Sequence, residues 1–228
     1  ARPSSFGSGA ETVSASLTVL VPAYNEGEGL REFQRRTLAV LDGLALSTRI
    51  LYVDDGSSDD TWSVMGDLAR ADARVGVLKL SRNFGKELAL TAGLDHCDSD
   101  AVIILDADLQ DPPELIPEFV ARWQQGADVV AGQRLERHGE SWLKRATASA
   151  FYRVMASLAS TPVPRDTGDF RLMSRRAVDA LCGMRERQRF MKGLFAWVGF
   201  RQEALIYQRE ARFAGRSKFS YWRLWNLA

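Results

Sequence analysis

Two carboxylates spaced one residue apart, Asp106 and Asp108, directly follow the apolar run 101–105. The run has the composition of a strand buried on both faces. Ligands bind at the carboxyl ends of strands in open α/β sheets. Together with Gln110, the two aspartates supply the hard oxygen donors that Mg²⁺ or Mn²⁺ prefers, with positions left for phosphate oxygens. An acidic surface turn is the simpler alternative, but the place of the pair after five apolar residues favours a metal site.

A second acidic pair, Asp54 and Asp55, follows another apolar run at 49–53. A carboxylate at this place can accept hydrogen bonds from a base imide or from a ribose hydroxyl. A turn with a helix cap, served by Ser57, is the alternative, and the two interpretations are compatible.

The first apolar run, 17–21, is followed by Pro22-Ala23-Tyr24-Asn25-Glu26. Tyr24 is placed to stack on a base, and Glu26 is placed to hydrogen-bond the nucleoside. A plain β–α loop explains the same residues, so this stretch alone decides nothing.

Cations occur after the fifth apolar run and near the end of the chain. Arg134, with Lys144 and Arg145 behind it, is expected to bind an anionic acceptor, although a solvated helix face explains the latter two equally well. Arg212, Arg216 and Lys218 surround Gly215, and we expect this basic loop to close over a diphosphate. A membrane-facing basic patch or a disordered tail is the alternative.

The apolar periodicity predicts the elements that must hold these residues. We expect strands at 17–21, 49–53, 75–80, 101–105 and 127–131, with helices at 28–43, 60–71, 86–96 and 112–125 between them. Beyond them we expect a long helix at 140–160, a strand at 168–173, a helix at 174–184 and a strand at 202–208. The alternation predicts an α/β fold with a mostly parallel sheet and helices on both faces. Its polar loops then meet along one edge of the sheet.

Composition bounds the function. Thirty Lys and Arg residues against 29 Asp and Glu residues give a net charge of +1, which gives no support to a nucleic-acid-binding role. Ten cations against three glutamates between 185 and 223 predict an anionic partner in the C-terminal part. Two distant cysteines and two histidines form no metal-binding pattern, and no apolar stretch is long enough to span a membrane.

The domain boundaries follow from these features. We expect a flexible Ser/Gly-rich leader at 1–16, one catalytic domain at 17–210, and at 211–228 the basic loop followed by an amphipathic juxtamembrane helix. The aromatic stretch 219–227 favours a membrane interface, with a helix packed on the core as the alternative.

Four motifs occur in order: Val21–Glu26, Val53–Asp59, Ser81–Lys86 and Asp106–Pro113. Together they resemble the family-2 inverting glycosyltransferases with the GT-A fold. Residues 132–134, 166–172 and 212–218 narrow the resemblance to the polyprenyl-phosphate glycosyltransferases, which include the dolichyl-phosphate mannose synthases and the bacterial bactoprenol glucosyltransferases. The resemblance covers residues 17–228.

The resemblance implies a nucleotide-sugar donor, a divalent metal and a polyprenyl monophosphate acceptor. The metal ligands would be Asp106, Asp108 and Gln110, and the acceptor phosphate would be held by Arg134, Lys144 and Arg145. The donor would contact Pro22, Ala23, Tyr24, Glu26, Asp54, Asp55, Lys86, Asp106, Ala107, Arg212 and Arg216. The residues implied in the reaction itself are Asp108, Asp169, Arg134, Arg171 and Lys218.

The expected reaction is transfer of one hexose with inversion. UDP-glucose is the expected donor and GDP-mannose is the rival. The chain lacks the Gln-x-x-Arg-Trp motif of processive synthases, which argues for a single transfer. The resemblance also implies an anionic membrane surface at the cytoplasmic face of the cell membrane, with transmembrane helices following residue 228. The sequence does not decide between a monomer and a homo-oligomer.

Three competing functions stay in view. A glycosyltransferase with a soluble hydroxyl acceptor would have no use for the aromatic and basic C-terminal stretch. A non-catalytic nucleotide-sugar-binding or membrane-adaptor module would have no use for an intact Asp106-x-Asp108. A Rossmann dehydrogenase is disfavoured, because Pro22–Glu26 is no glycine fingerprint.

Overall fold

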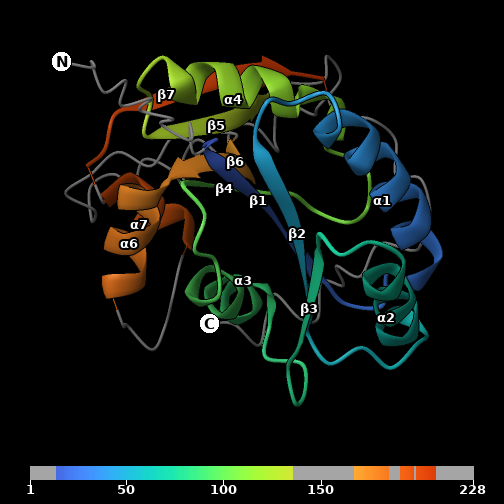
Figure 1. Cartoon of the computed structure of the whole chain (residues 1–228). Coiled ribbons are helices and arrows are strands. Elements are labelled where there is room, and N and C mark those ends of the chain that lie inside the picture. The colour runs from blue at the N-terminus through green and yellow to red at the C-terminus, as the bar shows by residue number, and fades with distance from the viewer. Residues whose placement is uncertain (1–13, 136–166, 185–190, 198, 209–228) are drawn as a thin grey trace, which may run out of the picture.

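A computed structural model describes residues 14–135, 167–184, 191–197 and 199–208. Figure 1 shows a central twisted sheet with helices on both sides of it. The strands are β1 (Ser16–Ala23), β2 (Ser47–Asp54), β3 (Val75–Lys79), β4 (Ala101–Ile104), β5 (Val129–Arg134), β6 (Thr167–Ser174) and β7 (Gln202–Tyr207). The helices are α1 (Gly27–Leu41), α2 (Thr61–Ala71), α3 (Lys86–Asp95), the 3₁₀ turn η1 (Pro113–Leu115), α4 (Ile116–Gln124), α6 (Arg175–Gly183) and α7 (Met191–Trp197).

The sheet has seven strands in the order β3-β2-β1-β4-β6-β5-β7. The pairs β1–β2, β1–β4, β2–β3 and β5–β7 are parallel, as the alternation of strands and helices predicts. Strand β6 instead lies antiparallel between β4 and β5. This insertion is not readable from the order of elements, and it brings the first residues of β6 to the edge where β1, β2 and β4 end.

Two apolar layers hold the sheet between helices. Leu17, Val19 and Val21 of β1 face one layer, which α1, α2 and α4 complete. Leu20 faces the opposite layer with residues of α3, α6 and α7. This alternation along β1 is what a strand buried on both faces requires.

The expected elements that fall within the described residues are confirmed with small shifts in their bounds. The helix expected from 112 begins as the turn η1, where the missing N–H of Pro113 costs no helical bond. Gly126 follows α4 with φ of 99°, as a glycine ending a helix does. The fifth strand runs on to Arg134, so this cation is the last strand residue and not a loop residue. The expected helix at 140–160 lies outside the described residues, as do positions 1–13 of the expected leader.

A close backbone contact joins the loops after β2 and β3. Gly56 has φ of 68°, and a Cβ on it would lie 2.4 Å from the Arg82 carbonyl carbon and 2.6 Å from the Asn83 nitrogen. Both obstacles are backbone atoms, so a side chain at this position would force the two loops apart. A non-glycine residue would also be strained in this left-handed conformation.

We therefore predict that Gly56→Ala lowers the free energy of unfolding by about 3 kcal/mol, because strain and overpacking add. Urea unfolding followed by circular dichroism measures this change. Gly183→Ala is the control, since Gly183 ends α6 and a Cβ there meets nothing within 4 Å. Equal unfolding midpoints for the two variants would contradict the predicted contact.

Candidate active site

The carboxyl edge of the sheet gathers the predicted site residues from four strands. Ala23 at the end of β1 is level with Asp54 at the end of β2. Asp106 lies two residues beyond the end of β4. Ile104 pairs with Arg171, so the antiparallel β6 carries Asp169 toward the same edge. The polar loops thus converge as the sequence predicts, with β6 as an additional contributor.

The centre of this edge is an ion cluster of one lysine and two aspartates. Lys86, the first residue of α3, places its Nζ 2.6 Å from Asp106 Oδ1 and 2.6 Å from Asp169 Oδ2. Burial by itself lowers the pKa of the Lys86 ammonium, but the charges of Asp106 and Asp169 outweigh it and hold this pKa above its ordinary value. The ammonium is therefore charged at neutral pH and neutralises part of the cluster.

The loop that follows Asp106 is tightly folded. Leu109 is buried and adopts φ of 58°, a conformation that is uncommon for a branched side chain. Asp108 Oδ1 accepts a hydrogen bond from the Gln110 backbone N–H at 3.1 Å. The turn at Leu109 therefore holds Asp108 and Gln110 on either side of one backbone bend.

The donor set of this loop fits a small divalent cation. In the described part of the chain, no three His, Cys, Asp or Glu side chains form a ready metal cage. Magnesium, however, is usually bound by one or two carboxylates together with substrate phosphates and water. Asp106 and Asp108, which are separated by one residue, and the Gln110 amide oxygen are donors of that kind.

The two residues of the second acidic pair, Asp54 and Asp55, make different contacts. Asp55 accepts from the Phe84 and Gly85 backbone N–H groups at 2.8 and 2.9 Å, so it fixes the loop that begins α3. Asp54 Oδ1 accepts from the Ser57 N–H at 2.9 Å. Asp54 Oδ2 is buried, and the described residues give it no hydrogen-bond partner. Asp54 and Asp55 were both predicted to contact the nucleotide sugar. Of the two, Asp54 has an oxygen without a hydrogen-bond partner among the described residues, whereas Asp55 positions Lys86.

The loop after β1 is tied to the loop after β2. Asn25 has φ of 53°, and its N–H donates to Ser57 Oγ at 2.9 Å. The Glu26 N–H donates to Thr61 Oγ1 at 2.8 Å. These bonds give the predicted Pro22–Glu26 segment a defined conformation at the sheet edge, with Tyr24 half-buried in it.

A hydrogen-bonded trio lies beside the ion cluster. Tyr207, the last residue of β7, donates its hydroxyl to Asp111 Oδ1 at 2.5 Å, and Arg134 contacts Asp111 Oδ2 at 3.2 Å. Gly168 makes room for Arg134, because a Cβ on it would lie 2.8 Å from the guanidinium. Sequence reasoning missed Asp111 and Tyr207. Asp111 belongs to the Asp106–Pro113 motif, so the motif could have identified it. No residue pattern near Tyr207 in the sequence indicates its role.

Burial changes the charge properties of this trio and of its neighbour Arg171. Burial raises the pKa of the Tyr207 hydroxyl, and the negative charge of Asp111 raises it further. The hydroxyl therefore keeps its proton and remains a hydrogen-bond donor. Arg171 is only 3% exposed, stacks on the Phe195 ring at 3.6 Å and donates to the Gly168 carbonyl at 2.8 Å. Burial lowers the pKa of Arg171 to about 10. Arg171 thus lies beneath the edge, while Asp169 reaches the ion cluster.

Five predicted site residues, Lys144, Arg145, Arg212, Arg216 and Lys218, lie outside the described residues.

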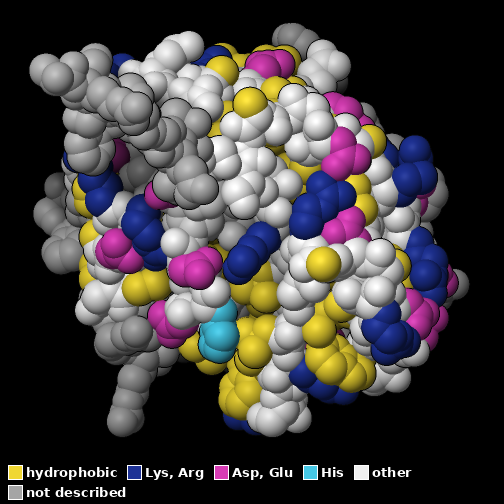
Figure 2. Space-filling model, viewed as in Figure 1, with side chains coloured by type: hydrophobic (Ala, Val, Ile, Leu, Met, Phe, Trp, Pro, Cys, Tyr) yellow, Lys and Arg dark blue, Asp and Glu magenta, His cyan; other side chains and the backbone are white. Residues whose placement is uncertain are grey.

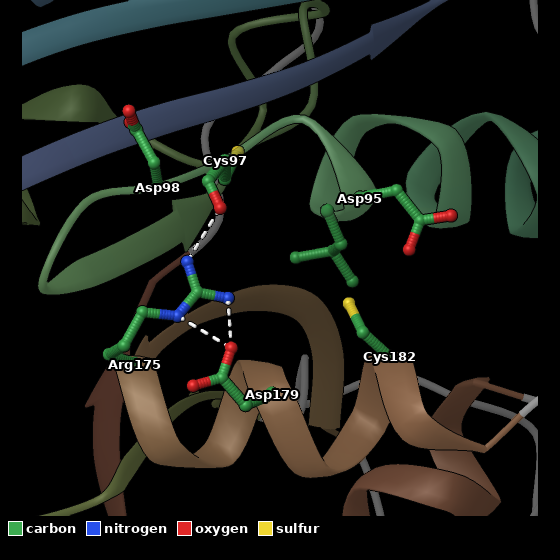
Figure 3. Close-up of a pocket in the computed structure, with 7 residues that line it drawn as sticks. Asp95, Cys97, Asp98, Arg175, Asp179 and Cys182 are labelled. Atoms are coloured by element: carbon green, nitrogen blue, oxygen red, sulfur yellow. Dashed lines mark hydrogen bonds and ion pairs between the residues drawn. The ribbon is translucent and has the colours of Figure 1, made fainter.

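A cavity of about 420 Å³ lies away from this edge, between the end of α3 and α6. Figure 3 shows Arg175 reaching across to the Cys97 carbonyl, at 2.6 Å, while Asp179 on the same helix binds its guanidinium at 2.9 Å. Cys97 and Cys182 are both free thiols. The cavity belongs to the opposite edge of the sheet, because Cys97 precedes β4 and Arg175 follows β6.

The outer surface of α1 and α2 carries both signs of charge. Figure 2 shows Lys and Arg side chains interspersed with Asp and Glu over this side of the molecule. Asp67 on α2, for example, pairs with Arg31 on α1 and with Arg70. Because positive and negative side chains alternate on this surface, it offers nucleic acid no continuous basic patch there, in line with the net charge.

The chain belongs to glycosyltransferase family 2: residues 18–182 match the family model named Glycosyl transferase family 2. The predicted class, a hexosyltransferase with the GT-A fold, is confirmed by this match and by the neighbours below.

Curated relatives extend over nearly the whole chain. It is 47% identical over 216 residues to an uncharacterised glycosyltransferase of Synechocystis, covering 95% of this chain and 68% of the relative. It is 43% identical over 212 residues to the bactoprenol glucosyl transferase of Shigella phage SfV, covering 93% and 69%. The chain thus spans about two thirds of the length of these relatives, and the predicted resemblance to the bactoprenol group is confirmed.

Solved structures share the fold. Glucosyl-3-phosphoglycerate synthase from Mycobacterium tuberculosis, in complex with Mn²⁺, UDP and its product, superposes with a TM-score of 0.61 at 20% identity, covering 88% of this chain and 73% of that one. A mannosyltransferase from Pyrobaculum calidifontis, in complex with GDP-Man and Mn²⁺, gives a TM-score of 0.57 at 20% identity, covering 86% and 57%. At this identity the likeness establishes the fold alone.

We predict that Tyr207→Phe lowers the free energy of unfolding by about 1–3 kcal/mol, because buried Asp111 loses a hydroxyl donor. Urea unfolding of the purified variant gives the value. Tyr52→Phe is the matched control: Tyr52 is also buried, but its hydroxyl has no hydrogen-bond partner among the described residues. We expect Tyr52→Phe to be neutral or stabilising, and equal losses in both variants would contradict the role of the Asp111 bond.

Proposed function

We propose that this glycosyltransferase transfers a single glucose from UDP-glucose to a polyprenyl monophosphate with inversion, assisted by Mg²⁺ or Mn²⁺. Identity of 43% to a bactoprenol glucosyl transferase supports the sugar and the lipid acceptor. GDP-mannose is the alternative donor. The observation that carries the proposal is the ion cluster, in which Lys86 pairs with both Asp106 and Asp169.

The donor is proposed to lie across the ends of β1, β2 and β4. Asp54, with its spare buried oxygen, accepts from the base or the ribose, and Tyr24 stacks on the base. A divalent metal, when bound, would neutralise the charge that develops on the leaving nucleoside diphosphate. Asp106, Asp108 and Gln110 would hold it. Lys86 adds a positive charge beside the same diphosphate.

The pairing of two of the carboxylates supports a phosphate acceptor. Transfer to a hydroxyl needs a carboxylate that is available to take a proton. Asp106 and Asp169 are instead both ion-paired to Lys86 at 2.6 Å. A phosphate oxygen is already anionic near neutral pH and attacks the anomeric carbon without such a base. Arg134 provides a cation at the same edge that can bind this phosphate.

Two apolar side chains next to the cluster favour a lipid acceptor over a soluble one. Phe84 and Leu88, on either side of Lys86 in the sequence, are each 39% exposed. Arg82 stacks on the Phe84 ring at 4.2 Å, which places a cation beside this apolar surface. Apolar side chains beside a phosphate site are what an isoprenoid chain would contact, and a soluble sugar or glycerate acceptor would not need them.

We place the reaction at the cytoplasmic face of the membrane, with residues 211–228 as the basic, amphipathic segment that meets anionic lipid. Within the described parts of the chain, none of the helices has the length and apolar character needed to cross a bilayer.

Transfer can be measured directly with radiolabelled UDP-glucose and undecaprenyl phosphate in detergent. We expect product with Mn²⁺ or Mg²⁺, loss of product with excess chelator, and a rate at least about 100-fold lower for Asp108→Asn, because that change removes charge stabilisation at the leaving group. Labelled GDP-mannose is run in parallel. Undiminished transfer in chelator would overturn the metal role, and preference for GDP-mannose would reassign the donor.

For the acceptor, we predict that Arg134→Gln raises the KM for undecaprenyl phosphate about tenfold or more while leaving the KM for UDP-glucose within about twofold, because one charged contact to phosphate is lost. Arg201→Gln is the control, as Arg201 is exposed and pairs only with Glu203 among the contacts described for it outside the backbone. Thermal unfolding of both variants separates a folding defect from a binding defect. An unchanged acceptor KM in a folded Arg134→Gln protein would remove Arg134 from the acceptor site.

A further inference from the structure

We propose that Lys86 is a built-in competitor of the divalent cation, which occupies Asp106 until metal and donor bind and keeps its contact with Asp169 afterwards. This inference rests on the proposed metal site and adds a residue that sets the affinity of that site. It concerns Lys86, which the resemblance placed only against the nucleotide sugar.

The geometry gives the competition. The Nζ of Lys86 contacts both oxygens of Asp106, at 2.6 and 2.9 Å, so both possible metal-binding atoms of that carboxylate lie against the ammonium. A cation that binds Asp106 must therefore face this ammonium at close range, where like charges repel strongly in a partly buried site. The side chains are 38% exposed for Lys86 and 24% for Asp106, which leaves water and a metal a path to the pair.

Lys86 has a second ion-pair partner, so it can release Asp106 without leaving the site. Asp169 Oδ2 lies 2.6 Å from Nζ, and it comes from β6, a different strand from the one that leads to Asp106. When Lys86 releases Asp106 it keeps one charged partner, so its ammonium does not become an unpaired charge at a partly buried site. The same movement leaves Asp106 free for the metal and keeps Lys86 at the edge, beside the diphosphate.

The backbone near Lys86 is fixed, so the exchange is confined to a side chain. Asp55 accepts from the N–H groups of Phe84 and Gly85, the two residues before the helix. On the other side, Glu87 Oε2 accepts from the Met191 N–H of α7 at 3.1 Å. Helix α3 therefore begins at a defined place, and the four-carbon lysine stem is the part that can move between partners.

Mn²⁺ alone is the probe, and its dissociation constant is measured by electron paramagnetic resonance of the free ion with no donor present. We expect Lys86→Met to bind Mn²⁺ about tenfold more tightly than the wild-type protein, because the competing ammonium is gone. Lys79→Met is the matched control. Lys79 ends β3 and lies over the Trp62 ring at 5.0 Å, so its removal should leave the affinity unchanged.

A double-mutant cycle with Asp169→Asn tests the second anchor. In the wild-type background this change leaves Lys86 with Asp106 alone, so Mn²⁺ should bind about threefold or more weakly. In the Lys86→Met background only the direct attraction of the Asp169 charge for the metal is lost, so the effect should be smaller. A larger rise in the thermal midpoint on adding Mn²⁺ should accompany tighter binding in each variant that folds.

The possible failures are distinct. Equal Mn²⁺ affinity in wild type and Lys86→Met, or additive effects in the cycle, overturns the competition while the metal site stands. Weaker binding by Lys86→Met, with its fold intact by circular dichroism, also overturns it. Absence of Mn²⁺ binding in every variant, with transfer that persists in chelator, overturns the proposed metal role and this inference with it.

Discussion

The structure of the site depends on one charge interaction, the contact of the Lys86 ammonium with Asp106 and Asp169. Two carboxylates at one sheet edge repel each other, and a partly buried edge amplifies that repulsion because the surroundings screen it poorly. Lys86 offsets it at 2.6 Å from each. Three separate elements must meet for the lysine to reach both carboxylates.

Each of those elements is placed by contacts that lie outside the cluster. Asp55 binds the two backbone N–H groups that precede Lys86, and Gly56 next to it allows the loop after β3 to approach without a side chain between. Strand β6 brings in Asp169 because it pairs with β4 through Ile104 and Arg171. The two residues of the acidic motif after β2 thus differ: Asp54 has a buried oxygen without a hydrogen-bond partner among the described residues, and Asp55 fixes the neighbouring loop.

The local sequence predicts most strands of the sheet and some of the residues of the candidate site. Apolar runs followed by polar loops are a short-range signal, so β1 to β4 and the loops at their ends could be read directly. The place of β6 could not, because an antiparallel insertion depends on pairing between Ile104 and Arg171, far apart in the chain. The Tyr207 bond to Asp111 joins residues 96 positions apart and has no local signature.

Arg171 illustrates a different limit of sequence reasoning. The resemblance implies a role for Arg171 near the reacting sugar or the acceptor phosphate, and Arg171 lies two positions after Asp169 on the same face of β6. The structure places the guanidinium beneath that edge, against the Phe195 ring and the Gly168 carbonyl. Periodicity gives the face of a side chain but not its depth, and depth decides whether a cation can reach a substrate or supports the groups that do.

The charge arrangement also bears on which acceptors this edge can serve. Lys86 lies 2.6 Å from both Asp106 and Asp169, so a proton taken up by either carboxylate would break a close ion pair, even though burial raises the pKa of the Asp106 carboxyl. An acceptor that arrives already ionised avoids this cost, and it needs cations such as Arg134 to offset its own charge. The ion cluster and the acceptor's charge are then two aspects of one constraint: a site with its carboxylates neutralised internally is suited to a nucleophile that brings no proton to remove.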